Sequence, residues 1–291
     1  MKIDLYLMTF KGYCALKHLI ETGKTDLVAN VITSADANVT NDYHKDIIEL
    51  CRQNKIGWYD RKDCLKGKGN YSIAISWRWL LPTENLVILH DSILPKYRGF
   101  APLVTALINK DKEIGVTALL AVREYDKGPI ICQKKLTVEY PIKIQDAIER
   151  ISTLYGEILY DIVVRLESGE PLSSCDQDES SASHTLWLDE DDYTINWEKD
   201  SEFIKRFIDS VGYPYKGAST VVNANKLRIF DATVVEDVVI VNRVPGKTFL
   251  VQSGIPTVVC GKGLIRLNDV KFDNDISRSF LPLKSLRIRF N

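Results

Sequence analysis

Short apolar runs alternate with amphipathic segments from residue 3 to residue 166, and this alternation restricts the fold more than any other feature of the chain. Strands that alternate with helices in this way form a mostly parallel sheet with helices on its faces. The pattern therefore predicts an α/β, Rossmann-like domain over residues 1–170. The predicted strands are Ile3–Met8, Leu27–Ile32, Ser72–Ser76, Leu86–Leu89, Val116–Val122 and Pro129–Leu136. The predicted helices are Gly12–Glu21, Tyr43–Asn54, Pro102–Asn109 and Ile144–Leu166.

The composition changes after this region. Residues 171–190 are rich in Ser, Asp and Glu and have little to bury, so we expect a linker there. Residues 191–291 begin with one helical pattern and continue with short β-type runs separated by turns, which is typical of a small OB-like β-barrel. The helix is predicted at Ser201–Val211, and the strands at Ser219–Val222, Lys226–Phe230, Val238–Val241, Thr248–Val251, Thr257–Cys260 and Leu264–Leu267.

Charge and composition exclude several classes of protein. The 291 residues include 38 basic and 39 acidic side chains, so nothing in the net charge favours a nucleic acid partner. No apolar run approaches the roughly 18 residues of a membrane span, and Met1–Met8 is typical of a first buried strand rather than a signal peptide. The 6 cysteines and 4 histidines are scattered without metal-ligand spacing. We therefore expect a metal-free protein with reduced thiols in the cytoplasm.

Two loops that follow predicted strands carry titratable side chains. His90 comes directly after the run Leu86–Leu89 and starts a loop that continues to Gly99. Asp126 stands in the loop after Val116–Val122, just before a Lys-Gly-Pro turn. Ligands of open α/β sheets bind beyond the carboxyl ends of the strands. A His and an Asp at adjacent strand ends could therefore form a proton-handling pair.

The first strand is followed by Thr9-Phe10-Lys11-Gly12-Tyr13, which lacks the glycine fingerprint of a dinucleotide site. The stretch from Ile88 to Gly99, read together with Asp126-Lys127-Gly128-Pro129, resembles instead the motif pair of the folate-dependent formyltransferases. Segments of residues 191–291 are similar to the C-terminal barrel of the same family, among them Pro214–Ala218 and Gly261–Leu267. The resemblance extends over nearly the whole chain, and within that family it is nearest to the sugar N-formyltransferases, which are related to methionyl-tRNA formyltransferase.

This resemblance implies transfer of a formyl group from N10-formyltetrahydrofolate to an amine. The attacking amine must lose a proton while negative charge develops on the formyl oxygen, so the reaction needs a base and a partner for that oxygen. By resemblance, His90 acts at the formyl group and Asp126 orients His90 and raises its basicity.

One position departs from the family motif. The family has a catalytic Asn two residues before the His, and this chain has Ile88 there. Side chains two residues apart on a strand share one face, so Ile88 lies in or beside the predicted active site. Loss of an oxyanion donor costs about 3–4 kcal/mol in other acyl transfers. The chain could be slow, could use another donor, or could have lost its activity and kept the ability to bind folate or a nucleotide sugar.

Two acceptors remain open. Methionyl-tRNA formyltransferases carry a basic loop after the second strand, whereas residues 33–42 of this chain contain no Lys or Arg. The run Ser76–Pro82 is instead similar to a segment of sugar N-formyltransferases. We expect the amine of a dTDP- or UDP-linked amino sugar, used for surface polysaccharide such as O-antigen of lipopolysaccharide, as the acceptor. Methionyl-tRNA is the alternative, no membrane partner is expected, and a homodimer is left open.

The remaining site predictions are weaker. Two tryptophans of the Ser76–Pro82 run are candidates to line the pterin or nucleobase pocket, and backbone groups of that run and of the loop Val122–Tyr125 are candidates to contact the pterin edge. Residues of the His90 loop, with Arg78, are candidates for the sugar nucleotide. The charged run Arg61-Lys62-Asp63 is interpreted as a solvated face. The folate candidates are Trp77, Trp79, Leu80, Leu81, Val122, Glu124 and Tyr125. The sugar-nucleotide candidates are Arg78, Ser92, Lys96, Tyr97, Arg98 and Gly99.

Overall fold

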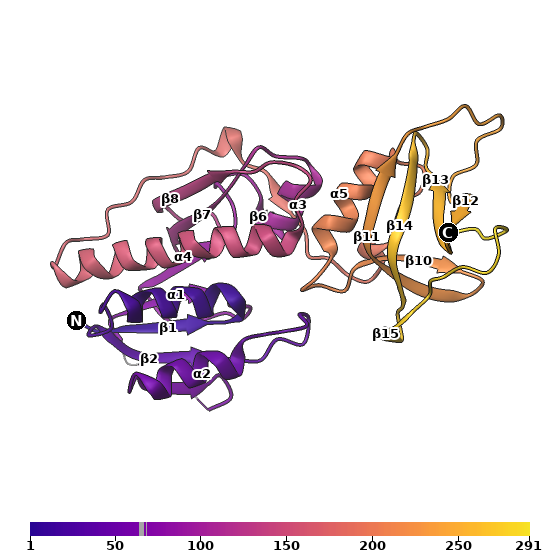
Figure 1. Ribbon diagram of the computed structural model, residues 1–291. Helices are drawn as coiled ribbons and strands as arrows, with labels where there is room; N and C mark the ends of the chain where they lie inside the picture. Colours follow the sequence, from indigo (N-terminus) through magenta and orange to yellow (C-terminus); the bar gives the residue numbers. More distant parts are fainter. Residues whose placement is uncertain (64–66, 68) are drawn as a thin grey trace. The chain divides into compact units, whose positions relative to one another are not determined.

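A seven-stranded sheet lies at the centre of the first of two units in the computed structural model, which describes residues 1–63, 67 and 69–291 (Figure 1). The strand order is β3-β2-β1-β4-β5-β7-β8, and the first five strands are parallel to one another. The expected Rossmann-like, mostly parallel sheet is thus confirmed. The strands are β1 (Ile3–Leu7), β2 (Val28–Thr33), β3 (Trp58–Asp60), β4 (Tyr71–Ile75), β5 (Leu86–His90), β7 (Glu113–Leu120) and β8 (Ile130–Thr137).

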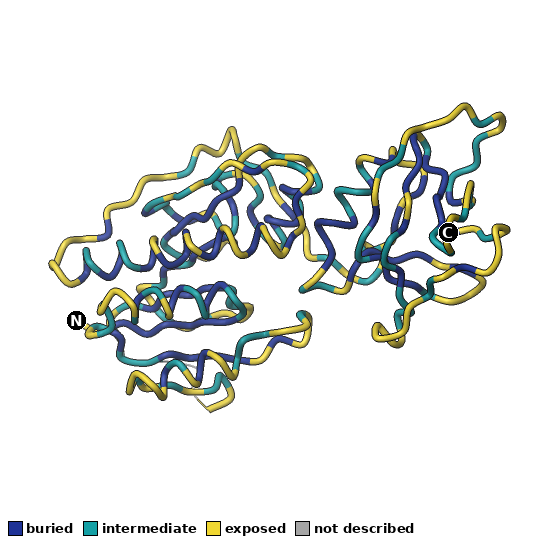
Figure 2. The backbone as a smooth tube through the Cα atoms, in the orientation of Figure 1, coloured by how far each residue is buried: buried dark blue, intermediate teal, exposed yellow. Residues whose placement is uncertain are grey.

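Helix α1 contacts both α2 and α4, and β1 is buried along its whole length (Figure 2). The contact with α4 includes an edge-to-face pair between His18 and Tyr160, with ring centroids 6.0 Å apart. Continuous apolar strands such as β1 are typical of parallel sheets, which are covered on both faces. The helices of this unit are α1 (Thr9–Glu21), α2 (His44–Gln53), α3 (Pro102–Ile108) and α4 (Ile144–Glu167).

The direction of β7 differs from the expectation. β7 pairs with β5 in the antiparallel sense, with His90 opposite Thr117 and Val87 opposite Leu120. The carboxyl ends of β5 and β7 therefore lie at opposite edges of the sheet, and the argument from adjacent strand ends was wrong for this pair. The loop after β7 has to return along the sheet to bring Asp126 to His90.

The segment expected to be a linker is ordered against the first unit as far as Trp187. Cys175 exchanges backbone hydrogen bonds with Ile130, and β9 (His184–Thr185) pairs in parallel with β6 (Arg98–Gly99). Backbone hydrogen bonds, rather than burial of apolar side chains, hold this polar segment in place. The first unit consists of Met1–Ala106, Asp111–Val138 and Asp146–Trp187, and the second of Leu107–Lys110, Glu139–Gln145 and Leu188–Asn291.

The second unit is an antiparallel sheet with strand order β10-β11-β14-β13-β12, and β15 pairs with β14. Residues near the C-terminus bridge the two outer strands: Asn291 exchanges hydrogen bonds with Val221 of β10, and Ile288 accepts one from Thr248 of β12. The closed arrangement agrees with the expected barrel. The elements are α5 (Ser201–Val211), β10 (Ala218–Val222), β11 (Asn225–Val235), β12 (Thr248–Gln252), β13 (Ile255–Val259), β14 (Leu264–Phe272) and β15 (Asp275–Ser279).

One predicted strand of this unit is absent from the described chain. Val238–Val241 forms no strand and is exposed, with Val239 97% accessible. The run is held at its ends instead, because Arg243 donates hydrogen bonds to Asp237 and to the carbonyl of Val238. Apolar, β-branched composition alone was therefore insufficient to predict pairing.

None of the helices in the described residues is both long enough and apolar enough to cross a membrane.

Candidate active site

His90 ends β5, and the protein holds both of its ring nitrogens. The residue is 8% exposed. Its Nε2 lies 2.9 Å from the carbonyl oxygen of Tyr97. A carbonyl oxygen only accepts, so Nε2 is the donor and carries a proton. In a neutral ring this leaves Nδ1 as the basic atom, and Nδ1 is the nitrogen that faces Asp126.

Asp126 is fixed beside that nitrogen. Its Oδ1 lies 3.6 Å from His90 Nδ1, and its Oδ2 accepts a hydrogen bond of 2.8 Å from the backbone N–H of Gly99. The backbone of Asp126 is left-handed, with φ of +54°, a conformation that Asp tolerates better than most residues. The structure therefore brings together the two residues on which the predicted chemistry depends.

Arg98 closes a ring of contacts around Asp126. Its guanidinium is buried and donates to Gln177 and Glu179. Gln177 in turn donates to the carbonyls of Asp126 and Gly128, both at 2.7 Å. Arg98 was predicted to bind a sugar nucleotide, but a phosphate could reach its guanidinium only after these bonds were broken. In this structure the side chain joins the His90 loop to residues 177–179.

A buried charged cluster, which the sequence reasoning missed, holds the start of the His90 loop. Asp91 forms an ion pair with Lys11 of α1 and accepts a hydrogen bond from the hydroxyl of Tyr155 of α4. Lys11 is 8% exposed and Tyr155 is fully buried. A Lys and a Tyr on amphipathic helices give no sequence signal of such a contact, since their partners are brought in by tertiary packing.

Polar side chains of β7 and β8 hold the turn that follows. Thr117 donates to the carbonyl of Ser92 at 2.6 Å and accepts from the N–H of Leu94 at 3.2 Å. Gln133 donates to Thr117 and to the carbonyl of Leu94, both at 2.8 Å. Ser92 itself is buried and its hydroxyl has no hydrogen-bond partner among the described residues. The antiparallel register of β7 thus places a hydrogen-bonding side chain under the loop.

Ile88 is half-buried in β5 between Ala74 of β4 and Leu119 of β7. Two-residue spacing puts its side chain on the same face as that of His90. Its hydrocarbon side chain can donate no hydrogen bond there.

Aromatic side chains follow β4 and form a stepped row. The Trp77 ring meets Tyr6 of β1 edge-to-face at 5.1 Å, and Trp79 meets Trp77 at 5.3 Å. Leu81 packs with Trp77 against the same small core cluster. The Trp77 Nε1 donor is buried without a partner among the described residues.

The other predicted binding residues are mostly open to solvent. Leu80 is 86% exposed and Tyr125 67% exposed, with Tyr125 contacting Phe100 at 6.1 Å between ring centroids. Gly99 has a positive φ of +103°, and a Cβ atom there would meet the carbonyl oxygen of Thr185 at 2.4 Å, so only glycine fits between β6 and β9. Exposed candidates in the same loops are Val122, Glu124 and Lys96, while Tyr97 is half-buried.

The loop after β2 is acidic and is held to the segment after β4. Asp36 is buried, forms an ion pair of 2.6 Å with Arg78, and accepts hydrogen bonds of 3.0 Å from the backbone and side-chain amides of Asn38. The N–H of Asp36 is bound by Asp42. Arg78, one of the predicted phosphate ligands, thus has its charge balanced, although its side chain remains 45% exposed.

Three of the described thiols are chemically unreactive and take no part in this arrangement. Burial raises the pKa of Cys51 and of Cys260 to about 12, and that of Cys14 to about 11. A thiol with so high a pKa is protonated at neutral pH and is a poor nucleophile. In the described residues no cluster of His, Cys, Asp and Glu could hold a metal ion.

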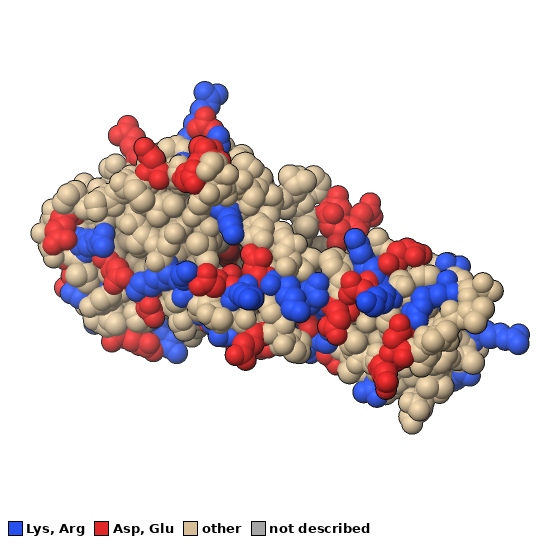
Figure 3. Space-filling view, turned by 90° about the horizontal axis from the view of Figure 1, so that it is seen from above, with Lys and Arg blue, Asp and Glu red and all other residues tan. Residues whose placement is uncertain are grey.

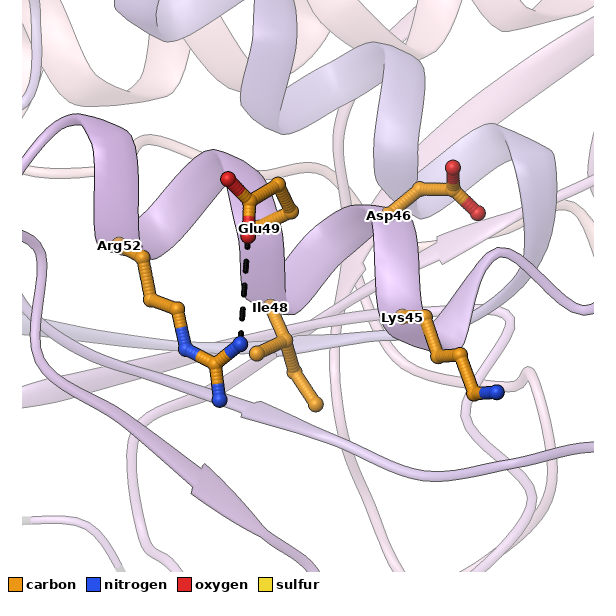
Figure 4. A pocket seen from close by; sticks show the side chains of 5 residues that line it. All are labelled: Lys45, Asp46, Ile48, Glu49 and Arg52. Atoms are coloured by element: carbon orange, nitrogen blue, oxygen red, sulfur yellow. Dashed lines mark ion pairs between the residues drawn. The ribbon is translucent and has the colours of Figure 1, made fainter.

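On the face drawn in Figure 3, basic and acidic side chains are interspersed along the described part of the chain. The hollow in Figure 4 lies along α2 and is lined in part by Ile48, Glu49 and Arg52. Arg52 and Glu49 form an ion pair of 3.9 Å there. The lining of the hollow comes from one helix, so it lacks convergent groups.

Two family models match the chain. The model described as "Formyl transferase" matches residues 80–163, which include His90 and Asp126. The model described as "Formyl transferase, C-terminal domain" matches residues 188–278.

Curated relatives carry the name methionyl-tRNA formyltransferase. The protein of Thermotoga neapolitana is 28% identical over 209 residues, which are 72% of this chain and 65% of that protein. The protein of Streptococcus sanguinis is 25% identical over 274 residues, which are 88% of this chain and 86% of that protein.

Solved structures with a similar fold carry other names. One is an N-formyltransferase from Helicobacter canadensis in complex with folinic acid and dTDP-3-aminofucose. Its TM-score is 0.69 at 17% identity, and the alignment covers 92% of this chain and 99% of that one. HypX from Aquifex aeolicus in complex with tetrahydrofolic acid has a TM-score of 0.64 at 18% identity, covering 94% of this chain and 44% of that one. At such identities these likenesses concern the fold.

Proposed function

This chain belongs to the folate-dependent formyltransferase family, and we propose that it moves a formyl group from N10-formyltetrahydrofolate to the amine of a dTDP- or UDP-linked amino sugar. The family accounts for the formyl donor and for the class of reaction. The position of His90 beside Asp126, 3.6 Å between Nδ1 and Oδ1, is the observation that supports catalysis in this chain.

The pair suits the proton transfer that the reaction requires. Because Nε2 donates to the carbonyl of Tyr97, Nδ1 of a neutral His90 is free to take the proton that the attacking amine loses. The Asp126 carboxylate stabilises the imidazolium that results, and Gly99 keeps that carboxylate in place. The bond from the amine nitrogen to the formyl carbon forms, the bond to N10 breaks, and the pair returns the proton to N10. Hydrogen-bond donors to the formyl oxygen must come from groups other than Ile88.

The donor would bind along the aromatic row. The buried Nε1 of Trp77, which has no partner among the described residues, fits the polar edge of a heterocycle, and the rings of Trp79 and Tyr125 are partly exposed in the predicted pocket. N10-formyltetrahydrofolate supplies the formyl group, and these residues would orient it toward His90. Leu80, Leu81, Val122 and Glu124 would complete that pocket.

The acidic loop after β2 favours a sugar amine over tRNA. Residues 33–42 contain no cation, and Arg78 beside them is paired with Asp36. Affinity for nucleic acid depends on Lys and Arg that neutralise phosphates, so this loop is poorly suited to a tRNA acceptor stem. A single diphosphate needs fewer cations, for which Lys96 is exposed and available.

The curated relatives favour the second candidate, methionyl-tRNA, because they carry the name of that enzyme and one of them aligns with 88% of this chain at 25% identity. One experiment separates the two. The protein would be incubated with N10-formyltetrahydrofolate and either a panel of dTDP- and UDP-amino sugars or charged initiator tRNA, with Asp126→Ala as the inactive control. A gain of one formyl group on a sugar, detected by mass spectrometry, supports the proposal. Formylation of the tRNA alone would replace it with the second candidate.

A further inference from the structure

Arg61, at the carboxyl end of β3, has a guanidinium without a carboxylate partner. No acidic oxygen of the described residues lies within ion-pair distance of it, and its Nε is buried without a hydrogen bond. The undescribed residues 64–66 and 68 are Cys, Leu, Lys and Lys, so they offer no carboxylate either. A partly buried guanidinium without a counter-charge costs free energy of folding, and an anionic ligand that pairs with it would offset this cost.

Nearby carboxylates are already occupied. Asp60 lies 3.2 Å from His44 Nε2 and accepts the N–H of Lys62 at 2.9 Å, while Asp36 is paired with Arg78. The charge of Arg61 therefore remains available for an anion. This differs from the earlier interpretation of Arg61 as part of a solvated face.

The guanidinium is also held in a fixed plane. Its Cζ lies 4.0 Å from the centre of the Trp79 ring, and Trp79 is supported in turn by Trp77 and Tyr6. The backbone N–H of Arg61 donates to Thr33 of β2 at 2.9 Å. Stacking on an aromatic face leaves the N–H edge of a guanidinium free for bidentate contact with a carboxylate or phosphate.

The position of Arg61 in the sheet is suited to binding the end of a substrate that lies far from the reacting group. Arg61 and Trp79 stand at the edge where β1 to β5 end, the edge at which open α/β sheets bind ligands. Four inter-strand steps of about 4.8 Å separate β3 from β5, on the order of 19 Å. An anion at Arg61 is thus remote from His90 and belongs to a part of the substrate that does not react.

We infer that Arg61, stacked on Trp79, is the anchor for an anionic group, a carboxylate or a phosphate, at the end of one substrate of this site. The inference rests on the proposed function, which offers two sources of that chemistry. One is the glutamate carboxylates of the folate, and the other is the diphosphate of the sugar nucleotide.

The test is calorimetric titration of the full chain with folinic acid, with thymidine and uridine diphosphate, and with inorganic pyrophosphate. Arg61→Met should weaken the binding of at least one probe about tenfold, the scale of one charge-assisted hydrogen bond, and Arg61→Lys should weaken it less. Loss for folinic acid alone assigns the anion to the folate. Loss for the diphosphates assigns it to the acceptor.

A matched control is present on helix α2, which precedes β3 in the chain. Arg52 also lies over a tryptophan, Trp58, at 5.2 Å, but it is paired with Glu49 (Figure 4). Arg52→Met should leave every dissociation constant unchanged. The inference is overturned if no probe binds the wild-type protein, if Arg61→Met binds all probes as the wild type does, or if Arg52→Met weakens binding equally. Failure of the proposed function would be recorded separately, as absence of formyl transfer by the wild-type protein.

Discussion

At the scale of single residues, the candidate active site combines the proposed acid–base pair with an apolar neighbour. The side chains of His90 and Asp126 are held by two backbone groups, the carbonyl of Tyr97 and the N–H of Gly99. Ile88 on the same strand face gives no hydrogen bond to the reacting oxygen. The site should therefore transfer protons well and stabilise the transition state poorly.

Ile88→Asn tests that imbalance. An amide at this position could donate to the formyl oxygen, and we expect kcat to rise on the order of 100-fold, the usual value of one oxyanion donor. Ile88→Leu is the control, because it changes shape without adding a donor. Steady-state rates with the accepted substrate would decide. An unchanged rate in Ile88→Asn would show that another group already fills this role.

At the scale of elements, buried Arg98 connects the His90 loop to residues 177–179. Arg98→Met should remove four hydrogen bonds and leave Gln177 free to release Asp126. We expect faster hydrogen–deuterium exchange in residues 171–187 and in the loop 121–129, together with lower activity. Lys96→Met is the control for exchange alone, because Lys96 is exposed in the same loop and its charge is proposed to contact the diphosphate. Unaltered exchange would contradict the connection.

The barrel of the second unit is closed by residues near the C-terminus. Phe290 is 1% exposed and packs against Trp197, with ring centroids 5.8 Å apart, while its backbone pairs with Gly246. Phe290→Ala should lower the free energy of unfolding of the second unit by about 3–5 kcal/mol, the usual cost of emptying a buried aromatic site. Chemical denaturation would measure it. Phe249→Ala, at an exposed position on β12, should cost far less.

At the scale of the whole molecule, buried and paired carboxylates determine the response to acid. Burial tends to raise the pKa of Glu190, but hydrogen bonds from Lys226, Lys216 and Arg228 outweigh it and lower the pKa to about 2. The pKa of Asp231 is lowered in the same way, with Asn268 and Lys143 outweighing burial. Asp209 is the exception, since its burial raises its pKa despite Lys205.

A lowered pKa stabilises the fold above the unfolded value near 4 and loses that stabilisation as the pH falls toward the folded value. Asp209 acts in the opposite direction, and the carboxylates with lowered pKa outweigh it. We therefore expect the melting temperature to be constant near neutral pH and to fall between about pH 5 and pH 2. Glu190→Gln should reduce this dependence. A melting temperature that rises on acidification would contradict the assignment.

The sequence allowed much of this architecture to be predicted, for identifiable reasons. Parallel strands β1, β2, β4 and β5 were evident because buried strands are continuous apolar runs, and His90 and Asp126 because a motif carries them. Strand β3 was missed, since it has only three residues and none of them is fully buried. The direction of β7 was not evident, since the connection of residues 91–112 is long enough for either sense. Arg61, Lys11 and Asp91 were missed because their partners are distant in the chain. Val238–Val241 has strand composition but no neighbouring strand.

The ring formed by Asp126, Gly99, Arg98 and Gln177 has a consequence for how the enzyme can be inactivated. Residues 179–181 form an exposed 3₁₀ turn that begins two residues after Gln177. A protease that cuts this turn would remove no catalytic atom, yet it would release the segment around Gln177 that binds the backbone of Asp126. Limited digestion should therefore abolish activity at the rate at which fragments cut at residues 179–181 appear on a gel, whereas cleavage in the exposed Val238–Val241 segment should leave activity in place.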